Sequence, residues 1–141
     1  MPDFSSFSAD QFAAALRRGA DGLWSLDAAV WLLTRHGVWL DSPELRKLAQ
    51  GGVDENDEVW AGFDVRRIKE AIDSGELGEW REDLAILLMA MSLYGDFPIS
   101  LRYTCEKLSE ENLALIGEAL FKACGHEVGL AVTEGRDHLA P

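Results

Sequence analysis

The feature that most constrains the fold is a helix-start signal that recurs along the chain. Ser8, Asp64 and Ser109 each carry a side-chain oxygen that can accept a hydrogen bond from the first turn of a helix. Each also has an apolar residue before it and another four residues after it, a pair that fixes the direction in which the chain enters the helix. Ser42 is a further cap, because Pro43 after it is favoured at the first helical position. We therefore expect a chain built mainly from helices.

Isolated glycines predict where these helices end, because glycine readily adopts the left-handed conformation that closes a helix. The glycines concerned are Gly19, Gly37, Gly51, Gly75, Gly95 and Gly125. Together, starts and stops predict helices over residues 9–18, 26–36, 43–50, 65–73, 80–94 and 110–124. With 48% hydrophobic and 27% charged residues the chain has a globular composition, so these helices have enough apolar surface to pack into a core.

The distribution of apolar residues distinguishes two of these helices. The segment Leu84–Tyr94 is apolar nearly all round, which is typical of a helix buried on most sides, so we place it at the centre of a bundle. The last helix instead has one apolar stripe, which we expect to be buried. That stripe consists of Leu113, Ile116, Gly117, Leu120, Phe121 and Cys124.

Two segments are ambiguous because their apolar residues alternate over a short distance, as in a strand. These residues are Ile99, Leu101 and Tyr103 in Pro98–Lys107, where a helical turn is equally compatible, and Val128, Leu130 and Val132 near the C-terminus. We predict a mainly α fold: a single domain over residues 1–141, built as a bundle of about five to seven helices. A short β hairpin or strand pair near the C-terminal half is left open, and residues 1–7 and 134–141 are candidates for flexible ends.

The net charge of −12 restricts the partners that this chain can bind. Such a charge repels nucleic acid and anionic membranes, whereas it attracts a basic protein. No signal peptide is visible, and the longest apolar run, Leu84–Met91, is far shorter than the ~20 residues that cross a bilayer. Cys105 and Cys124 are expected to be free thiols, which fits a cytoplasmic protein.

The acidic stretch Asp54–Glu58 raises the question of a calcium site. A calcium loop of the helix–loop–helix type needs glycine at its sixth position and glutamate at its twelfth. Counted from Asp54, these positions hold Val59 and Val65. We therefore predict no metal site and interpret the stretch as a solvated surface loop.

A small enzyme that uses Cys124 and His126 is one alternative. The two residues are close in sequence, and His138 follows further on. The spacing is not that of a zinc site, and no nucleophile elbow, phosphate loop or dinucleotide fingerprint accompanies it. We therefore predict no catalytic residue and no cofactor, and keep the enzyme only as an alternative.

A DNA-associated regulator is the second alternative. The apolar helix, His36-Gly37, the apolar turn and the Ser-Pro-Glu-Leu start of the next helix resemble the corner of winged-helix domains, which implies a DNA-reading helix at residues 43–50. The charges fit poorly, because Arg46 and Lys47 lie beside Glu44 and the acidic loop follows directly.

The five tryptophans are numerous for this length, and tryptophan is enriched at interaction hot spots. Trp31 and Trp80 lie in predicted helices, and we expect them to fill the core. Trp39 and Trp60 lie in connections, so each is a candidate for contact with a partner; for Trp39, a corner of the core is the other option.

Our leading hypothesis is therefore a non-catalytic interaction or regulatory protein that binds another protein. A basic partner fits the charge, as in an immunity-like or antitoxin-like inhibitor, and a homodimer is a further option. The candidate partner-binding residues are Trp39, Trp60, Asp54, Glu55, Asp57 and Glu58.

Overall fold

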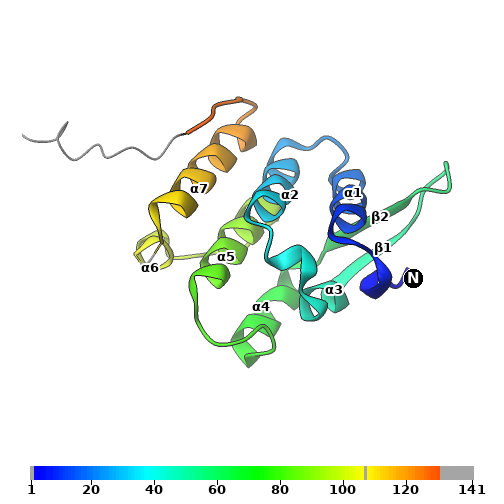
Figure 1. Cartoon of the computed structure of the whole chain (residues 1–141), viewed down its shortest axis with the longest axis horizontal. Helices are drawn as coiled ribbons and strands as arrows, with labels where there is room; N and C mark the ends of the chain where they lie inside the picture. Colours follow the sequence, from blue (N-terminus) through cyan, green and yellow to red (C-terminus); the bar gives the residue numbers. More distant parts are fainter. Residues whose placement is uncertain (1, 107, 131–141) are drawn as a thin grey trace, which may run out of the picture.

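The computed structural model describes residues 2–106 and 108–130, which form seven α-helices and one antiparallel sheet of two strands (Figure 1). The helices are α1 (Ala9–Ala20), α2 (Trp24–His36), α3 (Pro43–Leu48), α4 (Val65–Ser74), α5 (Glu82–Tyr94), α6 (Leu101–Cys105) and α7 (Glu110–Ala123). The strands are β1 (Ala49–Val53) and β2 (Val59–Phe63), and short 3-10 turns are formed by η1 (Phe4–Ser6) and η2 (Trp39–Asp41). The predicted mainly α fold with a short hairpin is confirmed. The hairpin, however, is formed by residues 49–63, which precede both of the segments that the sequence analysis considered as strands.

The capping residues start the helices as predicted. At α1, Ser8 Oγ accepts from the backbone N–H of Gln11 at 3.1 Å, and the N–H of Ser8 donates to Gln11 Oε1 at 2.8 Å. The side chains of Ser42, Asp64 and Ser109 accept backbone hydrogen bonds at the starts of α3, α4 and α7. These bonds satisfy donors that have no partner inside the helix, so each start is encoded locally.

The glycines divide into helix ends and points of close packing. Gly37 and Gly75 have φ values of 88° and 82° and close α2 and α4 in the left-handed conformation. Gly19 lies inside α1 instead, where a Cβ atom would collide with the carbonyl oxygen of Ala61 on β2. Gly51 lies inside β1, so the predicted helix 43–50 ends at Leu48.

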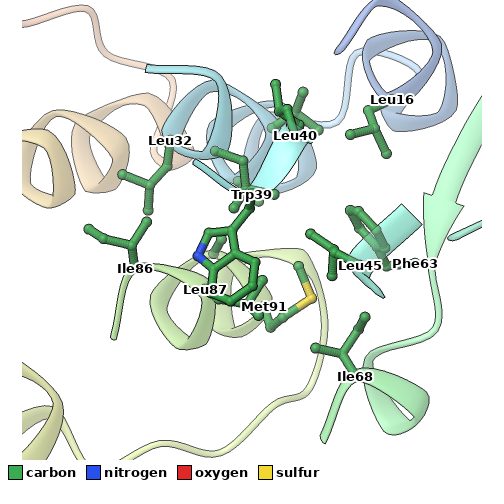
Figure 2. Packing of buried hydrophobic residues seen from close by; sticks show 14 of the residues in the cluster. Leu16, Leu32, Trp39, Leu40, Leu45, Phe63, Ile68, Ile86, Leu87 and Met91 are labelled. Atoms are coloured by element: carbon green, nitrogen blue, oxygen red, sulfur yellow. The ribbon is translucent and has the colours of Figure 1, made fainter. Parts of the chain in front are cut away.

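The core joins α2 to the helices and strands around it. Helix α2 packs against α5 and α7 on one side and against α1 on the other, and α1 lies against β2 (Figure 1). Seven side chains of α5 are buried, which confirms that this helix is enclosed on most sides. Trp39 lies among buried residues from several elements, including Leu32, Leu45 and Met91 (Figure 2). Phe4, in a segment considered as a flexible end, is buried in the same core.

Helix α7 corrects one prediction about the core. Of its apolar stripe, Ile116 is buried, but Leu113, Leu120 and Phe121 are exposed, and Cys124 is exposed as well. The helix lies at the edge of the bundle against α2 and α5, so the contact is narrower than the stripe (Figure 1). The buried face of α7 is therefore narrower than the apolar stripe in its sequence predicted.

The ambiguous segments also have a definite structure where they are described. Residues 98–106 contain the short helix α6, so the helical option was the right one. Val128 and Leu130 lie in irregular chain and not in a strand, while Lys107, Val132 and residues 134–141 lie outside the described residues. No helix in the described part of the chain is long and apolar enough to cross a membrane.

Candidate protein-binding surface

Trp39 is a core residue and not a partner-facing one. Its side chain is 1% exposed, and its indole Nε1 donates to the backbone oxygen of Asp83 at 2.6 Å. The guanidinium of Arg81 lies 5.1 Å from the ring centre. Of the two options for Trp39, the core position is therefore the observed one, and we remove Trp39 from the candidate surface. Trp39 was considered as a partner contact because it lies in a connection between helices, but this connection forms the 3-10 turn η2, in which Trp39 is buried.

The other five candidate residues all lie in the hairpin. Trp60 is on β2, and Asp54, Glu55, Asp57 and Glu58 form the connection between the strands, which projects from the body of the molecule (Figure 1). The acidic loop is thus the tip of a hairpin, and its charges are held at one end of the molecule.

The tip has a defined backbone because one of its carboxylates is used as an internal acceptor. Asp54 Oδ1 accepts from the N–H groups of Asn56 and Glu58 at 2.8 and 3.0 Å. Asp57 has a φ of 59°, a left-handed conformation that aspartate tolerates better than most residues. Glu55, Asp57 and Glu58 are left exposed, so the tip presents their charges to solvent.

The indole of Trp60 packs on the hairpin beside glycine residues. It pairs with Gly52 on β1, and a Cβ atom at Gly52 would stand only 3.1 Å from the indole Nε1. A Cβ atom at Gly62 would lie 4.0 Å from the Trp60 ring and 2.9 Å from Tyr94 Oη. Because Gly52 and Gly62 carry no side chains to cover it, the Trp60 side chain remains 38% exposed. Glycine at these positions therefore keeps a flat aromatic surface open.

The outer edge of β2 is closed by the rest of the molecule. Arg18 Nε on α1 donates to the carbonyl oxygen of Val59 at 2.6 Å, and the N–H of Phe63 donates to Tyr94 Oη at 3.3 Å. Arg18 Nε also lies 3.6 Å from the carboxylate of Glu58. This edge of the sheet is therefore occupied.

The outer edge of β1 is open. The N–H of Asp54 donates to the oxygen of Glu58, and bonding alternates along an antiparallel pair, so Gly52 and Gln50 also face β2. The backbone groups of Gly51 and Val53 then point outward. Within residues 2–106 and 108–130 they have no hydrogen-bond partner. An unpaired strand edge is a template for another strand.

This open edge escaped the sequence analysis. Residues 43–50 were assigned to one helix and Gly51 to its stop, although β1 begins at Ala49. A signal was available: Gly51-Gly52-Val53, a turn rich in Asp and Asn, and Val59-Trp60 are typical of a hairpin. The apolar pattern of the short helix before it concealed this signal.

The residues of the enzyme alternative are not assembled into a site. Cys124 is exposed at the end of α7, and His126 is exposed in the chain that follows. His138 lies outside the described residues. Within the part of the chain that the structure describes, no group of three or more His, Cys, Asp and Glu side chains is placed to hold a metal ion.

Helix α3 corresponds to the DNA-reading helix of the second alternative, and its arginine, Arg46, points into the protein. Arg46 is 9% exposed and donates to the carbonyl oxygens of Leu40 and Phe4 at 2.8 and 3.2 Å, and also to that of Phe7. Only Lys47 remains as an exposed cation on this short helix. That leaves little positive charge for contact with phosphates.

A buried histidine joins α2 to the start of α5. His36 Nε2 lies 3.3 Å from Asp83 Oδ1, with 8% of the His36 side chain exposed, and buried Nδ1 has no hydrogen-bond partner among the described residues. Burial lowers the pKa of His36 below its usual 6.5, although the Asp83 and Glu82 carboxylates oppose the shift. Protonation would put a donor at Nδ1 with no acceptor, so the neutral ring is favoured.

This lowered pKa predicts how stability changes with pH. The unfolded chain binds a proton at His36 more readily than the folded chain does. The contribution of the neutral His36 to the free energy of unfolding is therefore fully present above pH 6.5, and it is lost as the pH falls from there towards the pKa of the folded state. Urea denaturation at pH 8 and at pH 5.5 measures this loss. His36→Gln, which does not titrate, should lose less stability over that interval; an equal loss in both proteins would contradict the assignment.

Comparisons with known proteins do not assign this surface. No protein-family model, no curated protein and no solved structure matches the chain. The hairpin combines three features that a partner could recognise: the open β1 edge, the exposed Trp60 ring and the acidic tip.

Proposed function

We propose that the protein is a non-catalytic interaction protein that binds a basic, extended segment of another protein along the open edge of β1. The observation that carries this proposal is the unpaired edge at Gly51 and Val53, directly beside the acidic tip. A segment that adds as a third strand gains main-chain hydrogen bonds from the edge and specificity from its side chains.

The charge of the hairpin determines the chemistry of the partner. The whole chain carries −12, and the exposed carboxylates of Glu55, Asp57 and Glu58 stand at the end of the strand edge. Opposite potentials accelerate encounter and disfavour partners of the same charge. Lysine or arginine side chains in the added segment would therefore lie close to these carboxylates.

Trp60 would supply the apolar contact. Its ring lies on the face of the sheet that points away from the core, across Gly52 and Gly62. A third strand beside β1 extends this face, because side chains of neighbouring strands that point the same way are in contact. The glycine at position 52 leaves room for a partner side chain to reach the ring.

Proline at position 53 tests strand addition directly. Val53→Pro removes an N–H that points outward and leaves the bonds to β2 intact, and proline is tolerated on edge strands. Val53→Thr, which keeps the N–H, is the matched control. We measure binding of a short peptide that alternates lysine and valine. The affinity of Val53→Pro for the peptide should fall about tenfold, because the variant loses one hydrogen bond to the peptide and the proline ring disturbs the bond next to it. The affinity of Val53→Thr should not fall.

Two outcomes would count against this proposal. Equal affinity for both variants would mean that the peptide does not pair with the β1 edge. Equal binding of a peptide with glutamate in place of lysine would remove the argument from charge. Circular dichroism of both variants establishes that the fold is retained.

Neutralising the tip should slow association. Glu55→Gln with Asp57→Asn removes two charges without breaking a side-chain hydrogen bond, and asparagine also tolerates the left-handed conformation of position 57. At low salt, the association rate constant for the lysine–valine peptide should fall roughly threefold to tenfold. Stopped-flow measurement of the intrinsic tryptophan fluorescence, to which Trp60 contributes, reports the rate.

The control for this prediction is a pair with the same charge change elsewhere. Glu76→Gln with Glu79→Gln removes two exposed carboxylates near the start of α5. If this pair slows association as much as the tip variant does, total charge and not the hairpin is responsible. The difference between the two variants should shrink as salt is added, because salt screens exposed charges.

A second copy of the chain is the other occupant that the edge could accept. Homodimer formation would bring together two chains that each carry −12, which opposes association. Sedimentation of the wild type and of Val53→Pro tests this option. A dimer that the proline variant loses would identify the edge as a contact between copies.

A further inference from the structure

A second surface feature lies away from the hairpin. A cavity of about 350 Å³ is found over α2, between α1 and the end of α7. In Figure 1, α2 runs between these two helices. Its lining includes Trp24, Trp31 and Arg35 from α2, Arg17 from α1 and Lys122 from α7.

Two indole rings contribute to the lining of this cavity from the same face of α2. Trp24 and Trp31 are two helical turns apart, which places them on one side of the helix. Trp31 is half-buried, whereas Trp24 is 63% exposed. Gly125, with a φ of 82°, lets the chain after α7 pass against Trp24, since a Cβ atom there would lie 2.6 Å from the ring. The cavity thus offers flat apolar contacts.

The cavity also gathers positive charge in an acidic protein. Arg17, Arg35 and Lys122 line it, and none of the three has a carboxylate within ion-pair distance in the part of the chain that the structure describes. Lys122 Nζ lies 5.2 Å from the centre of the Trp31 ring. Against these three cations the lining holds two carboxylates, Asp27 and Glu127. The local balance is therefore opposite in sign to that of the chain.

From this combination we infer that the cavity binds a small organic anion with a planar ring. The ring would lie against the indoles, and the anionic group would pair with one or more of the cations that line the cavity, Lys122, Arg17 and Arg35. A volume of about 350 Å³ is within the range of small-molecule sites. An aromatic carboxylate and a nucleoside monophosphate share this chemistry.

The experiment is a calorimetric titration with four named probes. Naphthalene-2-carboxylate and adenosine monophosphate carry the charge, and naphthalene-2-carboxamide and adenosine are their uncharged counterparts. We expect one charged probe to bind at least tenfold more tightly than its uncharged counterpart. The probe that does so identifies the source of the anion. No binding of either charged probe at millimolar concentration would overturn the inference, as would equal affinity within both pairs.

Variants locate the binding site. Lys122→Gln should weaken binding at least fivefold, and Lys47→Gln, an equal charge change on α3 outside the cavity, should not. Trp31→Leu should also weaken binding, with circular dichroism as the check on folding. Equal binding by Lys122→Gln and Lys47→Gln would place the probe elsewhere. Val53→Pro serves to separate the two surfaces, because it should leave probe binding unchanged whether or not the hairpin binds peptides.

Discussion

Replacing Trp39 by alanine is expected to lower the free energy of unfolding by about 3–5 kcal/mol. The side chain is fully enclosed at the point where η2, α2, α3 and α5 meet (Figure 2), so its removal leaves a large cavity. The variant also loses the hydrogen bond from the indole to the oxygen of Asp83 and the contact with Arg81. Urea denaturation followed by circular dichroism measures the change.

Trp39→Phe separates volume from hydrogen bonding. Phenylalanine fills most of the space but leaves the Asp83 oxygen without this donor, so we expect a loss intermediate between wild type and Trp39→Ala. If Trp39→Ala were as stable as wild type, the indole could not be a central part of the core, and its interpretation as a partner contact would have to be reconsidered.

Replacing Arg46 by methionine is expected to cost about 2–4 kcal/mol, since it leaves buried carbonyl oxygens without a donor. The guanidinium donates to the oxygens of Leu40, Phe4 and Phe7, and so holds the N-terminal segment against α3. Methionine keeps a long apolar side chain at this position, but it loses the guanidinium that lies 5.5 Å from the centre of the Phe12 ring. Denaturation measurements on the variant report the loss.

Arg46→Lys is the control for this second prediction. Lysine keeps the charge but cannot reach several acceptors in a fixed fork, so it should recover only part of the stability. Equal stability of the methionine variant and wild type would show that these three hydrogen bonds contribute little. In that case Arg46 would be held inward by packing alone.

Much of the helical framework could be predicted because its signals are local. A serine or aspartate side chain bonds to the turn next to it, so Ser8, Ser42, Asp64 and Ser109 start helices wherever those helices finally pack. The burial of α5 was also predictable, because a helix that is apolar all round has no face to leave in water.

The errors occurred where distant parts of the chain decide the outcome. Ala49 and Gln50 continue an apolar helix pattern, yet they form a strand that pairs with residues more than ten positions away. Trp80 was expected in the core, but α5 begins only at Glu82 and the indole is 42% exposed, beside Tyr103. Pattern alone specifies neither the pairing of a strand nor the exact start of a buried helix.

The candidate surface was predictable only in part. The acidic residues and Trp60 were identified from composition and from their position between predicted helices, and the hairpin brings them together. The difference between the two edges of the sheet arises because Arg18 and Tyr94 bond to β2, whereas no described residue bonds to the outward backbone groups of Gly51 and Val53 on β1. Such asymmetry arises from tertiary packing and has no local signature.

The measurement that tests the central claim most directly is amide hydrogen exchange, residue by residue, with and without the lysine–valine peptide. The backbone N–H groups of Gly51 and Val53 point outward, whereas those of Gln50 and Gly52 already face β2. If the peptide adds as a strand, exchange should slow at Gly51 and Val53 and change little at Gln50 and Gly52. Binding that leaves exchange at Gly51 and Val53 unchanged would contradict the account.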